Sequence, residues 1–420
     1  MILIASKKIK KVHARWILDS RGNPTVEVDV HTDTKIGRAA VPQGASVGRY
    51  EAISLVDDSK AFNGHGVSHA INHVNKTLHT KLKGLDVTKQ EDIDNLMVTI
   101  DGTDDKSRIG ANAILGTSMA AARCGASVMK KPLYSYLGAK KVLPIPFSNF
   151  LNGGKHAGSE MKIQEFMLIP TKAKSFSQAT QMLSETYMDL KKILVNRYGK
   201  SSINIGDEGG FVPPIRRVNE ALKLLMKAME EAGYDKKMKI GIDAAASEFY
   251  NWKQQNYAIE GKNLLSREEL IDYYMDLIKA YPIVSIEDPF DQDDFESWKV
   301  LTKKSKIQIV GDDLTATNVD RVQEAVGQGL CNTLLLKLNQ IGTLTEAFDA
   351  ADLAKKNGWR IMASHRSGET NDNFISDLAV GMGYGEIKLG APCRGERVSK
   401  FNRLLRIEEE LKSKGKYMEF

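Results

Sequence analysis

The stretch Ile283-Val284-Ser285-Ile286-Glu287 is a short apolar run that ends in a carboxylate, and the second half of the chain repeats this pattern. Comparable runs occupy residues 239–243, 307–312, 334–337 and 361–365. Helical spacing of apolar residues follows the runs. Short buried strands that alternate with helices predict βα units and a parallel sheet.

The polar residues that end these runs are regularly spaced. Glu287, Asp312 and Lys337 follow one another at intervals of 25 residues, and His365 and Lys388 continue the series. An interval of this size accommodates one strand, one loop and one helix. This many units in about 280 residues favours a closed barrel, in which the carboxyl ends of the strands meet at one face. We therefore expect these polar side chains to converge.

The first part of the chain shows a different pattern of apolar and polar residues. Residues 9–56 alternate apolar and polar side chains, which predicts antiparallel strands, and residues 66–130 show helical spacing. Residues 111–129 are rich in small side chains, which permit close packing. We predict a smaller α+β domain over residues 1–139 and a barrel domain over residues 140–420.

Composition narrows the class of protein. The 420 residues are 42% hydrophobic and 27% charged, which is typical of a globular protein. The net charge of +6 comes from dispersed Lys and Arg, so we expect a solvated surface and no nucleic-acid partner. Cys124, Cys331 and Cys393 are scattered, and no run is long enough for a membrane span or signal peptide core. These features predict a cytoplasmic protein.

Asp243, Glu287 and Asp312 end three of the predicted strands. Two carboxylates 4 Å apart repel by about 4 kcal/mol at an effective dielectric of 20, and a bound cation removes that cost. Oxygen ligands without an accompanying Cys or His pair favour magnesium over zinc or copper. The alternative is that each acid only caps the helix that follows it.

Lys337 and Lys388 should project into the carboxyl end of the predicted barrel, beside these three acids. The positive charge of a neighbouring divalent metal lowers the pKa of a lysine, and a neutral lysine is a general base. The His365-Arg366-Ser367 segment adds a guanidinium and a hydroxyl suited to phosphate or carboxylate. An anionic substrate is indicated, although a lone lysine at a strand end is more often structural.

Two Gly-Lys pairs, at 154–155 and 199–200, superficially suggest a phosphate-binding loop. Such a loop requires a glycine five residues before the pair, and Asn149 and Leu194 occupy those positions. We therefore expect no nucleotide site.

Several segments of the chain resemble the enolase family. The resemblance runs from residues 14–28 to residues 404–411, and its most specific segments are residues 206–211 (GDEGGF), 285–290 (SIEDPF), 311–315 (GDDLT), 337–343 (KLNQIGT) and 364–370 (SHRSGET). The resemblance implies an eight-stranded α/β barrel with a smaller N-terminal domain. It also implies reversible dehydration of 2-phosphoglycerate to phosphoenolpyruvate.

The resemblance further implies roles for individual residues. Asp243, Glu287 and Asp312 would bind a first magnesium ion, and Ser46 a second one through the substrate phosphate. Lys337 would remove the C2 proton as base. Glu208 would assist departure of the C3 hydroxyl as acid.

The remaining implied residues would contact substrate: His156, Gln164 and Glu165 near the leaving hydroxyl and phosphate, Arg366 and Ser367 at the phosphate, Lys388 at the carboxylate, and His365 as a further substrate-binding residue. A purely structural interpretation is that His156 only orients its loop and Gln164 only packs a strand end. For the whole chain, the competing hypotheses are an acid dehydratase of the wider superfamily and a non-catalytic scaffold.

Some positions depart from the family pattern. Gln43 and Val47 flank Ser46 where Ser and Thr are usual, and Leu389 follows Lys388 where Thr is usual. These departures bear on closure of the Ser46 loop.

The resemblance also implies a homodimer or larger homo-oligomer, with Arg15 of one subunit paired with Glu396 of the next.

Overall fold

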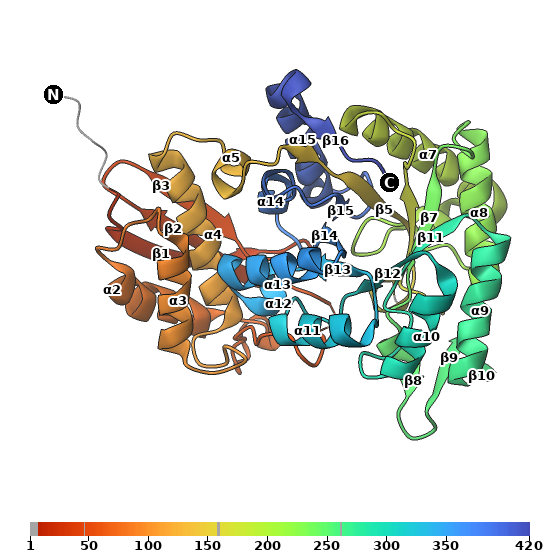
Figure 1. Cartoon of the computed structure of the whole chain (residues 1–420), viewed down its shortest axis with the longest axis horizontal. Helices are drawn as coiled ribbons and strands as arrows, with labels where there is room; N and C mark the ends of the chain where they lie inside the picture. The colour runs from red at the N-terminus through yellow and green to blue at the C-terminus, as the bar shows by residue number, and fades with distance from the viewer. Residues whose placement is uncertain (1–6, 46, 158–159, 261–262) are drawn as a thin grey trace.

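The computed structural model describes residues 7–45, 47–157, 160–260 and 263–420. The chain forms a small α+β part at its N-terminal end and a larger barrel, which lie side by side (Figure 1). Within the described residues, no helix is long and apolar enough to cross a membrane.

The N-terminal part is an antiparallel sheet covered by helices, as predicted. Strands β1 (Lys11–Leu18), β2 (Pro24–His31) and β3 (Ile36–Ala40) pair in that order. Alternate residues such as Val26, Val28 and Val30 are buried against helix α4 (Ala111–Val128). The small side chains of α4 allow the helix backbone to approach β3 closely.

The other helical segments of this part are short, apart from α3 (Gln90–Asp101). They are η1 (Ala61–Gly64), α1 (Ser68–Asn72), η2 (His73–Leu78), α2 (His79–Leu82), α3 and α5 (Leu133–Leu137).

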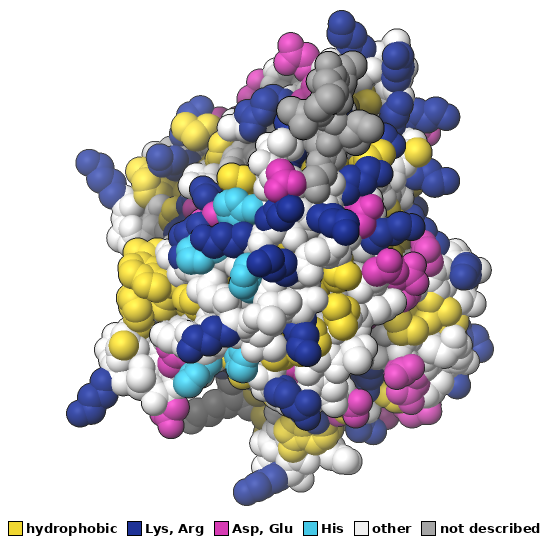
Figure 2. Space-filling model, turned by 90° about the vertical axis from the view of Figure 1, so that its left-hand side faces the viewer, with side chains coloured by type: hydrophobic (Ala, Val, Ile, Leu, Met, Phe, Trp, Pro, Cys, Tyr) yellow, Lys and Arg dark blue, Asp and Glu magenta, His cyan; other side chains and the backbone are white. Residues whose placement is uncertain are grey.

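On the face of the molecule shown in Figure 2, Lys and Arg side chains are interspersed with acidic and apolar groups. This dispersed pattern agrees with a solvated surface.

Eight strands close into the predicted barrel. In chain order they are β5 (Ile145–Asn152), β6 (Glu165–Ile169), β7 (Lys239–Asp243), β11 (Ile283–Glu287), β12 (Gln308–Gly311), β13 (Thr333–Leu336), β14 (Arg360–Ser364) and β15 (Glu386–Lys388). The expectation of a wholly parallel sheet is wrong for β6, which runs antiparallel to both β5 and β7. Residues 153–164 join β5 to β6 and include only the one-turn helix α6 (Gly154–Ala157), whereas a parallel crossover usually contains a longer helix.

Helices surround the barrel. They are α7 (Phe176–Tyr198), α8 (Val218–Glu231), α9 (Arg267–Ala280), α10 (Phe295–Ser305), α11 (Val319–Gln328), α12 (Leu338–Ile341), α13 (Leu344–Lys356), α14 (Phe374–Met382) and α15 (Gly395–Leu411). The remaining elements are short: η3 (Lys200–Ile203), η4 (Ala246–Phe249), η5 (Lys412–Lys414), the pair β4 (Val142–Leu143) and β16 (Lys416–Tyr417), and a small sheet of β8 (Tyr250–Asn251), β9 (Asn256–Glu260) and β10 (Asn263–Leu265).

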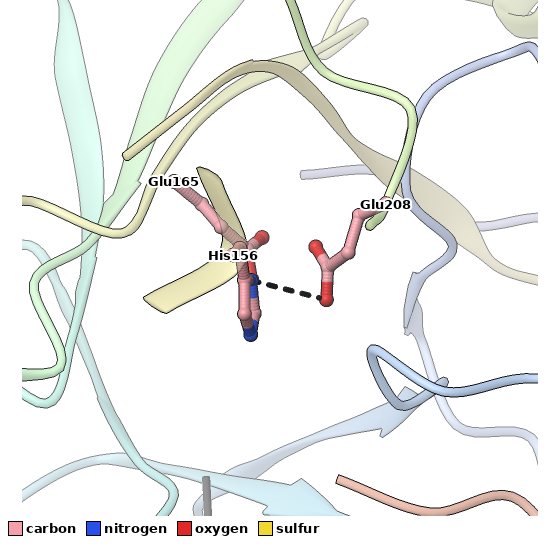
Figure 3. A group of neighbouring side chains, drawn as sticks. All are labelled: His156, Glu165 and Glu208. Atoms are coloured by element: carbon pink, nitrogen blue, oxygen red, sulfur yellow. Dashed lines mark ion pairs between the residues drawn. The ribbon is translucent and has the colours of Figure 1, made fainter. Parts of the chain in front are cut away.

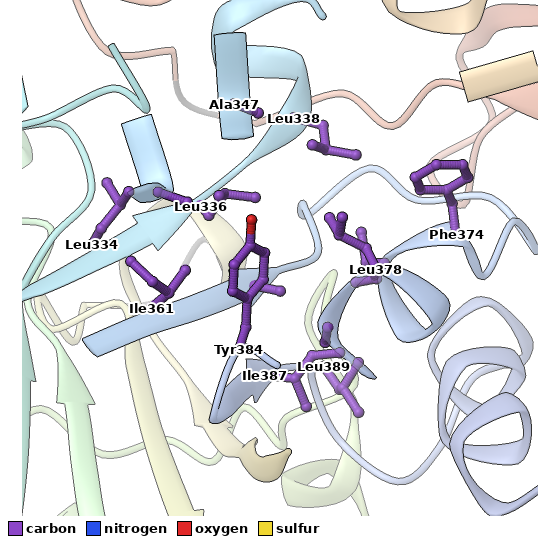
Figure 4. Close-up of a cluster of buried hydrophobic side chains, with 14 of the residues drawn as sticks. Leu334, Leu336, Leu338, Ala347, Ile361, Phe374, Leu378, Tyr384, Ile387 and Leu389 are labelled. Carbon is purple, nitrogen blue, oxygen red and sulfur yellow. The ribbon is translucent and has the colours of Figure 1, made fainter. Parts of the chain in front are cut away.

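Side chains of the barrel strands alternate between two cores. Leu335 belongs to the core inside the barrel, together with Phe147 and Met362. Leu334 and Leu336 belong to the outer core, which includes residues of α13 and α14 (Figure 4). This alternation fixes which strand residues face the barrel axis and therefore which side chains reach its mouth.

Polar contacts join the two parts of the chain. Asp94 of α3 accepts hydrogen bonds from the backbone N–H and the hydroxyl of Thr345, at 3.1 and 2.8 Å. Lys106 forms an ion pair of 2.8 Å with Glu346. These contacts hold the N-terminal part against the start of α13, beside the carboxyl end of the barrel.

Candidate active site

The predicted polar residues meet at the carboxyl end of the barrel. Asp243, Glu287 and Lys388 are the last residues of β7, β11 and β15, and Asp312 and Lys337 directly follow β12 and β13. All five side chains are buried or nearly so. Convergence of strand ends therefore brings together residues that lie far apart in the sequence.

Lys388 lies at the centre of three carboxylates. Its Nζ lies 3.0 Å from Asp243 Oδ2, 2.9 Å from both Glu287 oxygens and 3.1 Å from Glu165 Oε1. Burial alone would lower the pKa of Lys388, but the charges of Asp243, Glu165 and Glu287 outweigh it and raise that pKa well above its ordinary value. Lys388 is therefore an ammonium group in this arrangement.

Lys337 forms a second ion pair at the same mouth. Its Nζ donates to Asp312 Oδ2 at 2.5 Å, and Gln340 Nε2 donates to the other oxygen of that carboxylate at 2.8 Å. Burial lowers the pKa of Lys337, but the charge of Asp312 outweighs it and the pKa is raised. The lowered lysine pKa expected from the sequence concerns lysines beside a divalent cation and stays a prediction, whereas the acidic neighbours described here raise the pKa of both lysines.

His156, Glu165 and Glu208 form a buried cluster (Figure 3), which Lys388 contacts at Glu165. His156 Nδ1 lies 3.6 Å from Glu165 Oε1 and 3.5 Å from Glu208 Oε1. Burial and the charge of Glu208 raise the pKa of Glu165 well above its ordinary value. The positive charges of Lys388 and Arg397 favour the carboxylate form of Glu208 and act to lower its pKa. The pKa values of Glu165 and Glu208 are therefore shifted in opposite directions, although both side chains are buried.

His365 reaches the cluster from the end of β14. Its Nε2 lies 3.5 Å from Glu208 Oε1, while its Nδ1 lies 2.5 Å from Arg397 Nη1. A guanidinium only donates hydrogen bonds, so Nδ1 must be the acceptor and the Nε2 proton faces Glu208. Burial lowers the pKa of His365 well below its ordinary value, which agrees with this neutral tautomer.

Arg397 was missed by sequence reasoning. Its side chain is fully buried and also donates to the backbone carbonyls of Asp207, Arg366 and Ser367. It lies near the start of α15, not at a strand end, so the spacing that revealed the other residues gave no signal for it. It fixes the loop that carries His365.

Arg366 and Ser367 face the same cavity as the carboxylates, but Arg366 is already paired. Its guanidinium forms a two-point contact with Glu51, at 2.9 and 3.1 Å, and donates to Asn339 Oδ1 at 2.9 Å. Ser367 Oγ accepts from the N–H of Ala45 at 2.6 Å. Sequence reasoning also missed Glu51, because nothing in its local pattern points to the barrel.

Gly44 and Ala45, the two residues before Ser46, lie at this end of the barrel. Ser46 itself, the predicted ligand of a second magnesium ion, lies outside the described residues. Gln43 forms a two-way backbone bridge with Gly368, and Val47 is 68% exposed. Leu389 is buried in the outer core, away from the polar cluster (Figure 4).

The cavity among these residues measures about 20 Å³. It is lined by Gly44, His156, Gln164, Glu165, Glu208, Asp243, Lys337, Ser364, His365, Arg366, Ser367 and Lys388. Gln164 donates to Asp243 Oδ2 at 3.3 Å. A cavity of this size holds about one water molecule, so a larger ligand requires its walls to move. A wider cavity of about 400 Å³ opens at the amino end of the barrel, far from this chemistry.

The chemistry of the strand-end donors fits a hard divalent cation. Asp243, Glu287 and Asp312 present carboxylate oxygens only, and the two ammonium groups of Lys337 and Lys388 balance only part of their negative charge.

Two other groups of ligating atoms lie closer together within the described residues. They are His156 with Glu165 and Glu208, and Asp288 with Asp312 and Asp313, each within 4.8 Å. The first group includes an imidazole nitrogen, which a hard cation does not prefer. In the second group, Asp288 is engaged by the backbone N–H groups of Asp312 and Asp313. We therefore favour the three strand-end carboxylates as the site for a hard cation.

Both parts of the chain match models of one protein family. The family model "Enolase, N-terminal domain" matches residues 9–137, and "Enolase, C-terminal TIM barrel domain" matches residues 140–419. The chain is 52% identical over 410 residues to an enolase from Thermococcus gammatolerans, covering 96% of this chain and 95% of that protein. It is also 52% identical over 407 residues to an enolase from Methanocaldococcus jannaschii, covering 96% of each. With both of its parts matched over nearly their whole length, the chain belongs to the enolase family.

Proposed function

We propose that this enzyme dehydrates 2-phosphoglycerate reversibly to phosphoenolpyruvate, with Lys337 as base and Glu208 as acid. The observation that carries the proposal is that an amine and a buried carboxyl group face one cavity, together with the guanidinium of Arg366. Removal of a proton from one carbon and of hydroxide from the next requires a base and an acid on the same small molecule.

The C2 proton passes to Lys337 Nζ in this mechanism. The amine must be neutral to accept it, so the ion pair between Lys337 and Asp312 is the contact that has to weaken first. The C3 hydroxyl leaves as water when Glu208 delivers a proton. Glu208 must carry that proton when substrate is bound, and His156 lies beside it, with Nδ1 3.5 Å from Glu208 Oε1.

Asp243, Glu287 and Asp312 would hold the first magnesium ion, and Ser46 the second. When bound, these ions supply positive charge that stabilises the negative charge developing on the substrate carboxylate. Lys388 orients that carboxylate, and Arg366 and Ser367 bind the phosphate. Arg366 is preorganised for this task because Glu51 and Asn339 fix its guanidinium.

The test is to mix the purified protein with 2-phosphoglycerate and follow the ultraviolet absorbance of the enol phosphate, with and without magnesium. We expect an absorbance rise that requires magnesium and stops when a chelator is added. Absence of a rise in folded, magnesium-loaded protein would overturn the proposal. A rise with an unphosphorylated hydroxy acid instead would indicate an acid dehydratase of the wider superfamily.

We also propose a division into domains at residues 1–139 and 140–420, a cytoplasmic location and a homo-oligomer. The unpaired state of all three cysteines supports a reducing compartment.

Arg15 remains the proposed partner of Glu396 across subunits. Within its own chain Arg15 contacts Glu27 and Asp29.

A further inference from the structure

Arg49 lies three residues after Ser46 and is held from several sides. Its Nη2 donates to both oxygens of Asp291, at 3.0 and 3.2 Å, and its Nη1 lies 2.9 Å from Asp293 Oδ2. The guanidinium also stacks on the ring of Trp252, 4.4 Å from the ring centroid. We call Arg49, Trp252, Asp291 and Asp293 the Arg49 clamp.

The clamp joins three separate segments of the chain. Asp291 and Asp293 lie in the loop that follows β11, and Trp252 lies in the turn between β8 and β9. The backbone N–H of Arg49 donates to Gln292 Oε1 of the same loop at 3.2 Å. The side chain of Arg49 is nevertheless 45% exposed, and Trp252 is 54% exposed. Burial of apolar surface therefore does not explain these contacts, which rest on charge and on stacking.

A second arginine supports the residue next to the clamp. Tyr50 donates its hydroxyl proton to Asp293 Oδ1 at 2.9 Å, and the guanidinium of Arg321 lies 3.8 Å from the centroid of the Tyr50 ring. Arg321 in turn donates to the backbone carbonyls of Gln292 and Leu314. Two consecutive residues, Arg49 and Tyr50, are thus anchored to the same loop of the barrel.

The residue after this anchor reaches the active site. Glu51 is buried, accepts a hydrogen bond from the N–H of Gly48 at 3.1 Å and makes the two-point contact with Arg366. Gly48 packs so tightly on Asp313 that a Cβ at this position would lie 2.8 Å from Asp313 Oδ1. The backbone of residues 48–51 therefore has little freedom, and its position decides where the carboxylate of Glu51 lies.

We propose that Arg49 is a positioning residue for phosphate binding: by clamping residues 48–51 to the loop after β11 and to Trp252, it holds Glu51 where Glu51 orients Arg366. This inference rests on the proposed function for its substrate, and on the contacts above for its geometry. Arg49 acts through Glu51 and Arg366 and does not itself line the cavity. The β8–β9 turn thereby acts on the phosphate site only indirectly, through the contact of Trp252 with Arg49.

The proposal predicts a separation of KM from kcat. Loss of a partly exposed ion pair and a cation–π contact should loosen Glu51 and raise KM for 2-phosphoglycerate about tenfold in Arg49→Ala. The turnover number should stay within about threefold of the parent value, because phosphate binding is shared by the ground and transition states. Arg49→Lys keeps the charge but loses the planar fork and should be intermediate. Trp252→Phe should resemble the parent enzyme.

Arg197→Ala is the matched control. Arg197 is 55% exposed, pairs with Glu220 at 2.9 Å and lies 5.2 Å from the ring centroid of Tyr198, but it belongs to the outer helix α7. It reproduces the type of contact without the link to Glu51. We expect no change in KM for this variant. Equal KM values in the parent, Arg49→Ala and Arg197→Ala enzymes would overturn the proposal.

Two measurements are independent of turnover. Calorimetric titration with inorganic phosphate should show about tenfold weaker binding to Arg49→Ala than to Arg197→Ala. The Arg366→Gln variant lacks the guanidinium of the proposed phosphate site, so the heat that it loses identifies binding at that site. Trypsin should cut after Arg49 at least about threefold faster in Trp252→Ala than in Trp252→Phe, as read by mass spectrometry of the fragment. Unchanged phosphate binding together with unchanged cleavage refutes the clamp. Inactive parent protein that still shows both effects refutes the proposed reaction alone.

Discussion

Glu165 lies directly opposite Asp243 in the antiparallel pairing of β6 with β7. Because β6 runs against its neighbours, its first residue stands at the same rim as the last residue of β7. The reversed strand therefore adds a buried carboxyl group to the site next to Lys388. In a wholly parallel barrel, the residue at that position would face the opposite end.

The proposed base and acid can be separated by isotope exchange. Lys337→Ala should lower both exchange of the C2 proton with solvent and dehydration by roughly 10²–10⁴-fold, because no other amine is assigned to that proton. Glu208→Gln should lower dehydration more than exchange, since it acts at the second step. Proton loss from C2 is followed by NMR in deuterated buffer, and product by absorbance. An equal loss of exchange in the two variants would contradict the assigned roles.

Asp94 makes the stability of the domain contact depend on pH. Burial raises its pKa to about 6, despite hydrogen bonds from Ser118 and Thr345 that favour the carboxylate. The folded state therefore binds a proton more tightly than the unfolded state, whose pKa is near 3.8. This stabilising contribution is complete below about pH 4 and is lost as pH rises through about 6, by about 3 kcal/mol.

Denaturant unfolding of Asp94→Asn and of the parent protein between about pH 4 and 7 measures this dependence. An asparagine does not titrate, so the difference in unfolding free energy should move in favour of the variant as the pH rises. A difference that is constant with pH would show that Asp94 has an ordinary pKa.

Two glycine-to-alanine substitutions should have opposite effects on stability. A Cβ at Gly37 would lie 2.1 Å from the carbonyl oxygen of Ala120 and 2.3 Å from the N atom of Cys124, both backbone atoms of α4. Gly37→Ala should therefore cost about 1–3 kcal/mol or more. Gly327, in α11, has open space around its Cβ position, so Gly327→Ala should stabilise the helix by up to about 1 kcal/mol. Thermal unfolding of both variants measures the contrast, and similar midpoints would contradict it.

The proposed subunit contact can be tested by exchanging its charges. Arg15→Glu should shift the protein toward monomer, because it places two acids at the interface, and Arg15→Glu combined with Glu396→Arg should restore association. Light scattering coupled to gel filtration gives the molar mass of each variant. A mass unaffected by either change would rule out this pair as the interface contact.

The sequence alone determined much of the fold. Short apolar runs ending in polar residues predicted the barrel strands, and the period-2 pattern of residues 9–56 predicted the N-terminal sheet. These patterns can be recognised in the sequence because they depend only on which residues of a single strand are buried. The equal spacing of Glu287, Asp312 and Lys337 also predicted that their side chains share one face, which is where the structure places them.

The tertiary structure decided what depends on distant partners. The direction of β6, the contact of Glu51 with Arg366 and the tautomer of His365 set by Arg397 leave no trace in local periodicity. The lysine pKa values also came out raised, because they depend on how many carboxylates surround each ammonium. Hydrophobic pattern encodes which face of an element is buried, whereas hydrogen bonds and charges act between groups that only the folded chain brings within a few ångströms.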